Sequence, residues 1–235
     1  LRVTDAVEEG SRAGYRVDVC VPSGNFGNIY AGFLARSMGV PIRRLMLATN
    51  ENNVLEEFFN TGIYRPRSAE DTLATSSPSM DISKASNLER FIWALLGPEA
   101  FVQRWAELET TGTLDLRDQL PRLREEFGFV AGTSSHADRL EAIRSVKERS
   151  GRLIDPHTAD GVTVALRVME PGFPTLVMET AKAAKFPQTV TEALGSEPET
   201  PDVVADLLAR PQKVETIDNE EAPLRALIEE RALNR

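Results

Sequence analysis

One segment, residues 17–48, limits the fold more than any other. Residues 17–21 are a short run rich in β-branched side chains, and residues 23–28, Ser-Gly-Asn-Phe-Gly-Asn, form what we call the glycine loop. A helical pattern follows over residues 29–38, and residues 44–48 are a second strand candidate. A strand, a helix and a strand at this spacing imply a right-handed crossover between two parallel strands. The segment therefore predicts an α/β fold with a parallel sheet.

The remainder of the chain continues to alternate between helical and extended patterns. Apolar residues at helical spacing predict six further helices, over residues 52–60, 87–96, 98–108, 114–127, 134–150 and 155–168. Thr133 or Ser134 is expected to cap the fifth of them. Strands are expected over residues 127–131 and 174–179, and a Ser-, Thr- and Pro-rich loop over residues 68–83. After residue 194 we expect helices around charged connecting stretches.

The charge balance and the rare residue types exclude several classes of function. With 36 acidic and 27 basic residues the formal charge is -9, so the phosphate backbone of a nucleic acid would be repelled. The longest apolar runs are far shorter than the roughly 20 residues that span a bilayer. A single cysteine, Cys20, and two histidines allow no internal disulfide and leave little for a metal site. We expect a cytoplasmic protein with no metal and with no nucleic-acid or membrane partner.

The glycine loop is suited to holding an anion. In a parallel α/β sheet, ligands bind beyond the carboxyl ends of the strands, where loops of this kind lead into helices. Gly24 and Gly27 permit a positive φ or the close approach of a ligand, and the helix that follows offers unpaired N–H groups. Asn25, Asn28 and Ser23 add neutral donors. A loop with two glycines is also common as a tight turn alone, and this one matches neither the nucleotide P-loop nor the G-x-G-x-x-G pattern.

Several blocks, taken in order, resemble the threonine synthase family of the longer, microbial and fungal type. The first is Val-Pro-Ser-Gly-Asn-Phe-Gly-Asn at residues 21–28, followed by Met-Gly-Val-Pro at residues 38–41. Similar blocks occur at residues 48–55, 77–82, 86–90, 155–159 and 180–187, so the resemblance spans most of the chain. One departure is Lys182-Ala183, where the family commonly has His-Pro after Thr-Ala.

The resemblance implies both a fold and a reaction. The fold would be the three-layer, parallel-sheet fold of the tryptophan synthase beta-like type, here incomplete at its N-terminus. The cofactor would be pyridoxal 5'-phosphate (PLP), and the reaction would convert O-phosphohomoserine and water to threonine and phosphate. The implied ligands of the cofactor phosphate are Gly24, Asn25, Phe26, Gly27 and Asn28. Thr180 would place its hydroxyl at the pyridine nitrogen, where a hydroxyl, unlike a carboxylate, does not enforce a protonated ring.

For several other polar residues near these blocks, both a functional and a purely structural role are possible. Thr180 could instead be a hydroxyl at the end of a strand that bonds to the backbone. His157 could orient groups near the site, or could simply begin a helix. Asn87 and Arg90 could face the substrate, but a helix start and a solvated helix face explain them better.

The family's Schiff-base lysine is expected upstream of this chain. None of the five lysines, which are Lys84, Lys147, Lys182, Lys185 and Lys213, follows the pattern of that residue. We therefore name no catalytic residue and expect the chain to be a fragment, inactive alone. A sheet that lacks its neighbouring strands exposes an edge, which predicts self-association.

Two alternatives stay open on the sequence. One is a related enzyme of the same fold, such as a serine or threonine dehydratase or a cysteine synthase. The other is a non-catalytic module that binds a phosphate ligand without turning it over. In either case residues 1–194 are expected to be the carboxyl-terminal part of the large domain, and residues 195–235 a helical extension of it.

Overall fold

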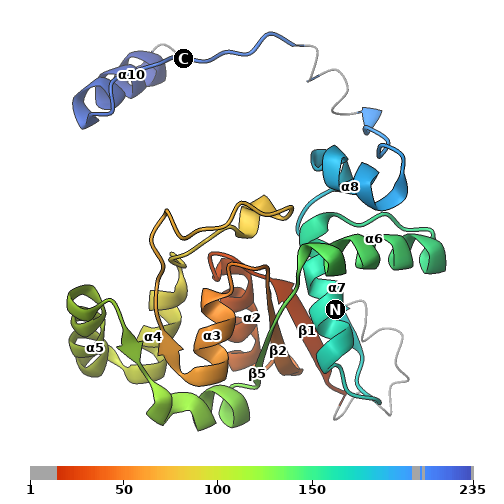
Figure 1. Cartoon of the computed structure of the whole chain (residues 1–235). Coiled ribbons are helices and arrows are strands. Elements are labelled where there is room, and N and C mark those ends of the chain that lie inside the picture. The colour runs from red at the N-terminus through yellow and green to blue at the C-terminus, as the bar shows by residue number, and fades with distance from the viewer. Residues whose placement is uncertain (1–14, 203–206, 208–209, 234–235) are drawn as a thin grey trace. The chain divides into compact units, whose positions relative to one another are not determined.

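A four-stranded parallel sheet forms the centre of the protein in the computed structural model, which describes residues 15–202, 207 and 210–233 (Figure 1). The strand order is β5-β2-β1-β6, and all three pairings are parallel. The strands are β1 (Val17–Pro22), β2 (Ile42–Thr49), β5 (Phe129–Thr133) and β6 (Thr175–Val177). The predicted parallel α/β sheet is confirmed, and β1 and β2 lie at its centre, where runs of apolar residues are buried on both faces.

Side chains of the central strands alternate between two apolar layers. Val19, Val21 and Leu45 face helices α2 (Gly27–Ser37), α3 (Val54–Thr61) and α4 (Leu88–Leu96) in the larger core cluster. Cys20 and Met46 face helix α7 (Pro156–Val168) on the opposite side. Because neighbouring residues of a strand point to opposite faces, the sheet is covered by helices on both sides (Figure 1).

Further helices extend these two layers. Helix α5 (Pro98–Thr111) follows α4, and helix α6 (His136–Ser150) packs against both α7 and α8 (Pro187–Leu194). The N-cap of α6 is Ser135, which forms a capping box with Asp138, so the predicted caps at Thr133 and Ser134 were two residues and one residue too early. Residues 68–83 contain only a short 3-10 turn, Pro78–Met80, as expected of a loop.

The predicted helix over residues 114–127 is wrong. Its first residues form strand β4 (Leu114–Asp115), which pairs antiparallel with β3 (Ile63–Tyr64). A 3-10 turn at Arg117–Gln119 and a π-helical turn at Arg122–Glu126 follow. Leu114, Leu116 and Leu123 are nevertheless buried. The apolar spacing therefore predicted which residues are buried, but not that the segment forms a strand and short turns instead of one α-helix.

The chain divides into two compact units, Leu1–Pro198 and Glu199–Arg235. Among the described residues of the second unit the main element is helix α10 (Glu221–Leu233). Helices were expected after residue 194, and part of that stretch, residues 203–206 and 208–209, lies outside the described residues. That residues 195–235 extend the large domain stays a prediction. None of the helices in the described part of the chain is long and apolar enough to cross a membrane.

Strand β6 carries a buried hydroxyl that nothing satisfies. Thr175 Oγ1 is shielded from solvent and has no hydrogen-bond partner among the described residues. Thr175→Val removes that hydroxyl, keeps the shape and suits a strand, so we expect it to raise the free energy of unfolding by about 1 kcal/mol. Urea denaturation of variant and parent checks this. A destabilised variant would mean that the hydroxyl is bonded in solution.

Candidate functional site

The glycine loop joins the carboxyl end of β1 to the start of α2. Ser23 N donates to Ala48 O of the neighbouring strand at 2.9 Å, which keeps the loop in line with the sheet. Phe26 is the N-cap of α2 and has a φ of 68°, the only positive φ of a non-glycine residue in the described chain. A left-handed conformation costs such a residue roughly 1–2 kcal/mol. The packing of its ring offsets this cost.

That packing is aromatic on several sides. The Phe26 ring is 1% exposed, and its centroid lies 5.6 Å from those of both Phe59 and Phe91. Phe129 of β5 completes the cluster at 6.1 Å. A strained residue that its surroundings hold so firmly is a common mark of a functional loop. The sequence allowed Gly24 and Gly27 either a positive φ or the close approach of a ligand, and in the structure the positive φ of the loop is at Phe26.

Gly24 instead permits a close approach of the chain to itself. A Cβ atom at Gly24 would lie 2.8 Å from Ile82 Cγ1 and 3.0 Å from Met80 Cα. The glycine loop therefore lies directly against the segment around Pro78–Met80, which no local pattern in the sequence had connected with it.

Asn25 ties the loop to the start of α4. Its carbonyl oxygen accepts from Asn87 N at 3.1 Å and from Asn87 Nδ2 at 3.0 Å, and its Oδ1 accepts from Ser86 Oγ at 3.1 Å. The structure thus brings Asn87 to the candidate site. These contacts use the oxygens of Asn25, so its side-chain amide donors stay available.

The start of α2 is open to an anion. Gly27 and Asn28 are exposed, and no side chain caps the helix. The first bond of the helix runs from Tyr30 N to Phe26 O, so the N–H groups of Gly27 and Asn28 have no partner among the described residues. Unpaired N–H groups at the positive end of a helix dipole stabilise an anion.

Thr180 follows the strand next to β1. Cys20 of β1 pairs with Val177 of β6, and Met178 N still donates to Cys20 O at 2.9 Å. Thr180 lies two residues further on, at the same edge of the sheet as the glycine loop. It is exposed, and its hydroxyl has no hydrogen bond within the described chain. The structure shows no bond from this hydroxyl to the backbone, and its role at a cofactor stays a prediction.

His157 supports the segment that lies against Gly24. Its Nδ1 is 2.8 Å from Asp155 Oδ1, and its Nε2 accepts from Ser79 N at 3.0 Å. Because Nε2 accepts, these bonds assign the proton to Nδ1. His157 also lies in the first turn of α7, with Asp155 as the N-cap. The structure therefore confirms that His157 begins a helix, and it shows a bond from Ser79 N; a role at the site stays a prediction.

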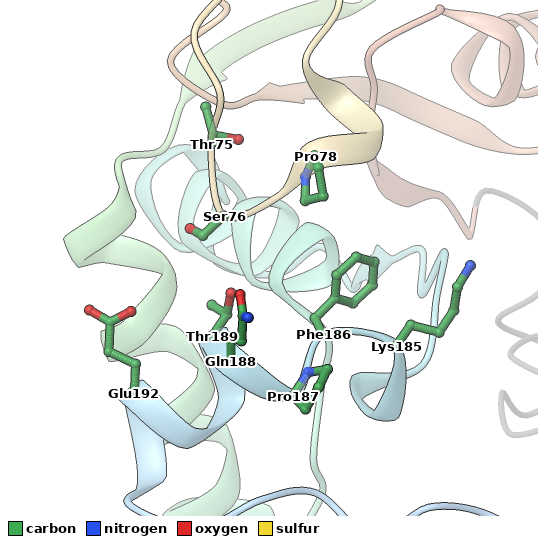
Figure 2. A pocket seen from close by; sticks show the side chains of 9 residues that line it. All are labelled: Thr75, Ser76, Pro78, Lys185, Phe186, Pro187, Gln188, Thr189 and Glu192. Atoms are coloured by element: carbon green, nitrogen blue, oxygen red, sulfur yellow. The ribbon is translucent and has the colours of Figure 1, made fainter. Parts of the chain in front are cut away.

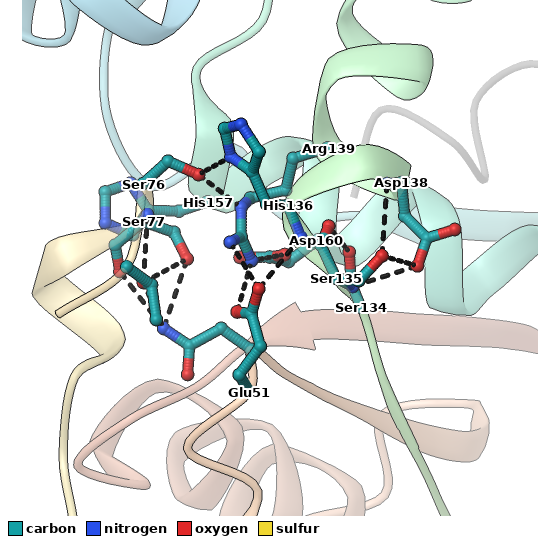
Figure 3. A network of polar contacts seen from close by, with 12 residues as sticks. Glu51, Ser76, Ser77, Ser134, Ser135, His136, Asp138, Arg139, His157 and Asp160 are labelled. Carbon is teal, nitrogen blue, oxygen red and sulfur yellow. Dashed lines mark hydrogen bonds and ion pairs between the residues drawn. The ribbon is translucent and has the colours of Figure 1, made fainter. Parts of the chain in front are cut away.

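A buried ionic network lies beside this turn and was missed in the sequence (Figure 3). Arg139 of α6 is fully buried, and its guanidinium bonds Glu51 through two nitrogens at 2.9 Å each. It also bonds Asp160 Oδ1 at 3.0 Å and Ser76 Oγ at 2.8 Å. The spacing with Ala142, Ile143 and Val146 placed Arg139 on the apolar face of its helix, and this was the signal that could have revealed it.

Burial raises the pKa of both carboxyl groups and Arg139 lowers it, and the balance differs between Glu51 and Asp160. Burial raises the pKa of Glu51, but the hydrogen bonds and charge of Arg139 outweigh it, so this pKa is lowered. Asp160 is more deeply buried, and burial raises its pKa to about 6 against the opposing effects of Arg139, Ser77 and Ser134. Its Oδ2 has no hydrogen bond of good geometry among the described residues.

Three of the lysines have contacts or surroundings that the structure describes. Lys182 Nζ lies 2.6 Å from Glu179, and Lys147 Nζ donates to Gly151 O at 3.2 Å. Lys185 lines a pocket at α8. Within the described residues, no group of three or more His, Cys, Asp or Glu side chains could hold a metal ion.

Comparisons with known proteins agree with the resemblance. A family model described as "Threonine synthase, C-terminal" matches residues 158–228. The threonine synthase of Methylobacillus glycogenes is 49% identical over 218 residues, covering 92% of this chain and 46% of that protein. The threonine synthase of Corynebacterium glutamicum is 50% identical over 212 residues, covering 87% and 44%.

Solved structures show the same fold. The PLP-bound threonine synthase from Brucella melitensis has a TM-score of 0.84 at 34% identity, covering 97% of this chain and 48% of that chain. Yeast threonine synthase has a TM-score of 0.82 at 28% identity, covering 97% and 49%. The chain spans about half the length of the relatives that it matches. On its sequence and its fold alike, the chain belongs to the threonine synthase family.

Proposed function

We propose that this chain provides the phosphate-binding half of the cofactor site of a PLP-dependent threonine synthase. The whole reaction would convert O-phosphohomoserine and water to threonine and phosphate. The observation that carries the proposal is the uncapped start of α2, where Gly27 and Asn28 present unpaired N–H groups at the carboxyl end of β1.

The residues present fit a phosphorylated pyridine. The glycine loop offers neutral donors from Gly24 to Asn28, which suit a phosphate held by hydrogen bonds. The Thr180 hydroxyl, which is unpaired and at the same edge of the sheet, can donate to a ring nitrogen. When bound, PLP supplies an electron sink for reactions at the substrate's amino-acid carbons. The chain's own contribution is to bind and orient.

His157 serves this role indirectly. The bond from Ser79 N to His157 fixes the turn that packs on Gly24, so the loop is supported from behind. Preorganised support of this kind keeps binding groups in place before the ligand arrives.

We further propose that none of the five lysines forms the Schiff base, so that the catalytic lysine is not among the residues of this chain. The cellular setting would be the cytoplasm. Self-association would use an edge strand of the sheet, which in the described chain is β5 or β6.

An absorbance titration with PLP, with and without borohydride, tests the proposal. We expect saturable binding that inorganic phosphate competes, and no stable adduct after reduction. Thr180→Val should weaken PLP binding about 5-fold, because it removes one hydrogen bond. Thr175→Val, the same change at a buried position in strand β6 just before Thr180, is the matched control and should leave binding unchanged.

Three outcomes would count against the proposal. A stoichiometric adduct at one lysine would show that the chain does contain the anchor. If inorganic phosphate did not compete with PLP, the glycine loop would not be the site that binds the cofactor phosphate. If Thr180→Val and Thr175→Val changed PLP binding equally, the Thr180 hydroxyl would not contact the cofactor.

A further inference from the structure

A pocket separate from the glycine loop opens at the start of α8 (Figure 2). We call it the α8 pocket, and it is lined by the first turn of α8, by Lys185 and Phe186, by residues 75, 76 and 78, and by Glu192. Its volume is about 510 Å³, enough for a small molecule. The turn at Pro78–Met80 separates the two sites, since Pro78 lines this pocket while Met80 lies against Gly24.

The first turn of α8 has donors without partners. Phe186 occupies the N-cap and supplies no side-chain hydrogen bond, and Pro187 takes the first helical position. The first bond of the helix runs from Val190 N to Phe186 O at 3.1 Å. The N–H groups of Gln188 and Thr189 therefore have no partner among the described residues, and both residues line the pocket.

Thr189 supplies a second and independent indication. The residue is only 9% exposed, yet its hydroxyl has no hydrogen bond within the described chain. Figure 2 shows the polar ends of Thr189 and Gln188 on the side that faces Ser76, across the pocket. Because this hydroxyl has no protein partner and lines the pocket, it is free to bond a ligand or water there.

The polar groups on the opposite wall are already engaged. Ser76 Oγ accepts from Arg139 Nε at 2.8 Å and lies 2.7 Å from His136 Nδ1, to which it can donate. On α8 itself, Glu192 Oε1 lies 2.9 Å from His136 Nε2. The unused donors of the pocket therefore lie at the start of α8, and Lys185 lines the pocket with its side chain directed away from Gln188 and Thr189 (Figure 2).

We propose that the α8 pocket binds a small oxyanion, either a phosphate or a carboxylate group. Two backbone N–H groups and the Thr189 hydroxyl would each donate to one of its oxygens, and the helix dipole would add a favourable partial charge. The proposal does not depend on the proposed function, because it uses none of the residues assigned to the cofactor.

Amide chemical shifts, followed during a titration with sodium phosphate at constant ionic strength, test the proposal. We expect the amides of Gln188 and Thr189 to shift saturably. Thr189→Val should weaken this response at least about 10-fold, since it removes a hydrogen bond to a charged group. Thr191→Val, the same change in the same helix but outside the pocket, should behave like the parent. Thr189→Ser keeps the hydroxyl and should retain binding.

Parallel titrations with sulfate and acetate distinguish the two kinds of oxyanion, and chloride is the non-specific control. Shifts that chloride reproduces, or that Thr189→Val leaves intact, would overturn the proposal. So would silent amides at Gln188 and Thr189. The amides of Gly27 and Asn28 report the glycine loop in the same spectra, so a failure of one site is distinguishable from a failure of the other.

Discussion

Replacing Arg139 by methionine should lower the free energy of unfolding by about 3–5 kcal/mol at pH 7. The methionine fills much of the same space, but it leaves Asp160 fully buried and Glu51 partly buried without their cation. A buried carboxylate that loses its partner keeps the cost of desolvation and loses the attraction that offset it. Ser76 would also lose the donor at 2.8 Å that fixes it beside the α8 pocket.

Urea denaturation at pH 7 measures this loss, and the same helix offers a control. Arg144 is also on α6, but its side chain is 40% exposed and its contact with Glu141 is 3.3 Å long. Arg144→Met should therefore cost less than about 1 kcal/mol. If the two variants lost similar stability, the network around Arg139 would have no special part in holding the fold together.

The strands and the glycine loop were predictable because their signals are local. β-branched residues in β1 and the loop between it and α2 are adjacent in the sequence. Burial on both faces of the sheet leaves β1 apolar except at Asp18, whose buried carboxylate pairs with Arg43 and Arg44. The position of Thr180 beside the loop was likewise expected from the family blocks, and the register between Cys20 and Val177 gives it a structural basis.

The segment 114–127 was not predictable because distant contacts decide it. The apolar spacing of its leucines fits a helix, but Leu116 N donates to Gly62 O at 2.7 Å and Leu114 pairs with Tyr64. Gly62 has a φ of 75° and lies so close to Arg117 that a Cβ atom would come within 2.7 Å of its Cα. Pairing with a strand some fifty residues earlier outweighs a modest helix preference.

The supports of the site were missed for the same reason. His157 and Ser79 are 78 residues apart in the sequence, and Arg139 and Glu51 are 88 apart. The sequence shows that these polar residues are present, and its periodicity can place Arg139 on an apolar helix face. Neither observation identifies the residue that each of them contacts. The conformation of Phe26 has a similar origin, since contacts with Phe59, Phe91 and Phe129 hold it.

Asp160 gives this network a dependence on pH that can be measured. Its pKa is raised from the ordinary value of 3.8 to about 6 by burial. A carboxyl group with a higher pKa in the folded protein binds its proton more tightly there than in the unfolded chain. The stability that it contributes is therefore complete below pH 3.8 and is lost as the pH rises through about 6. A pKa difference of this size corresponds to about 3 kcal/mol.

Asp160→Asn should remove that dependence, because the amide resembles the protonated acid and does not titrate. Relative to the parent, the variant should gain about 2.4 kcal/mol of stability between pH 4 and pH 8. Only the difference between the two proteins is informative, because Glu51 and Asp155 have lowered pKa values and change the parent's stability in the opposite direction. Urea denaturation of both at pH 4, 5, 6, 7 and 8 gives the comparison. A constant difference would mean that Asp160 titrates near its ordinary pKa, with Arg139 fully compensating for its burial.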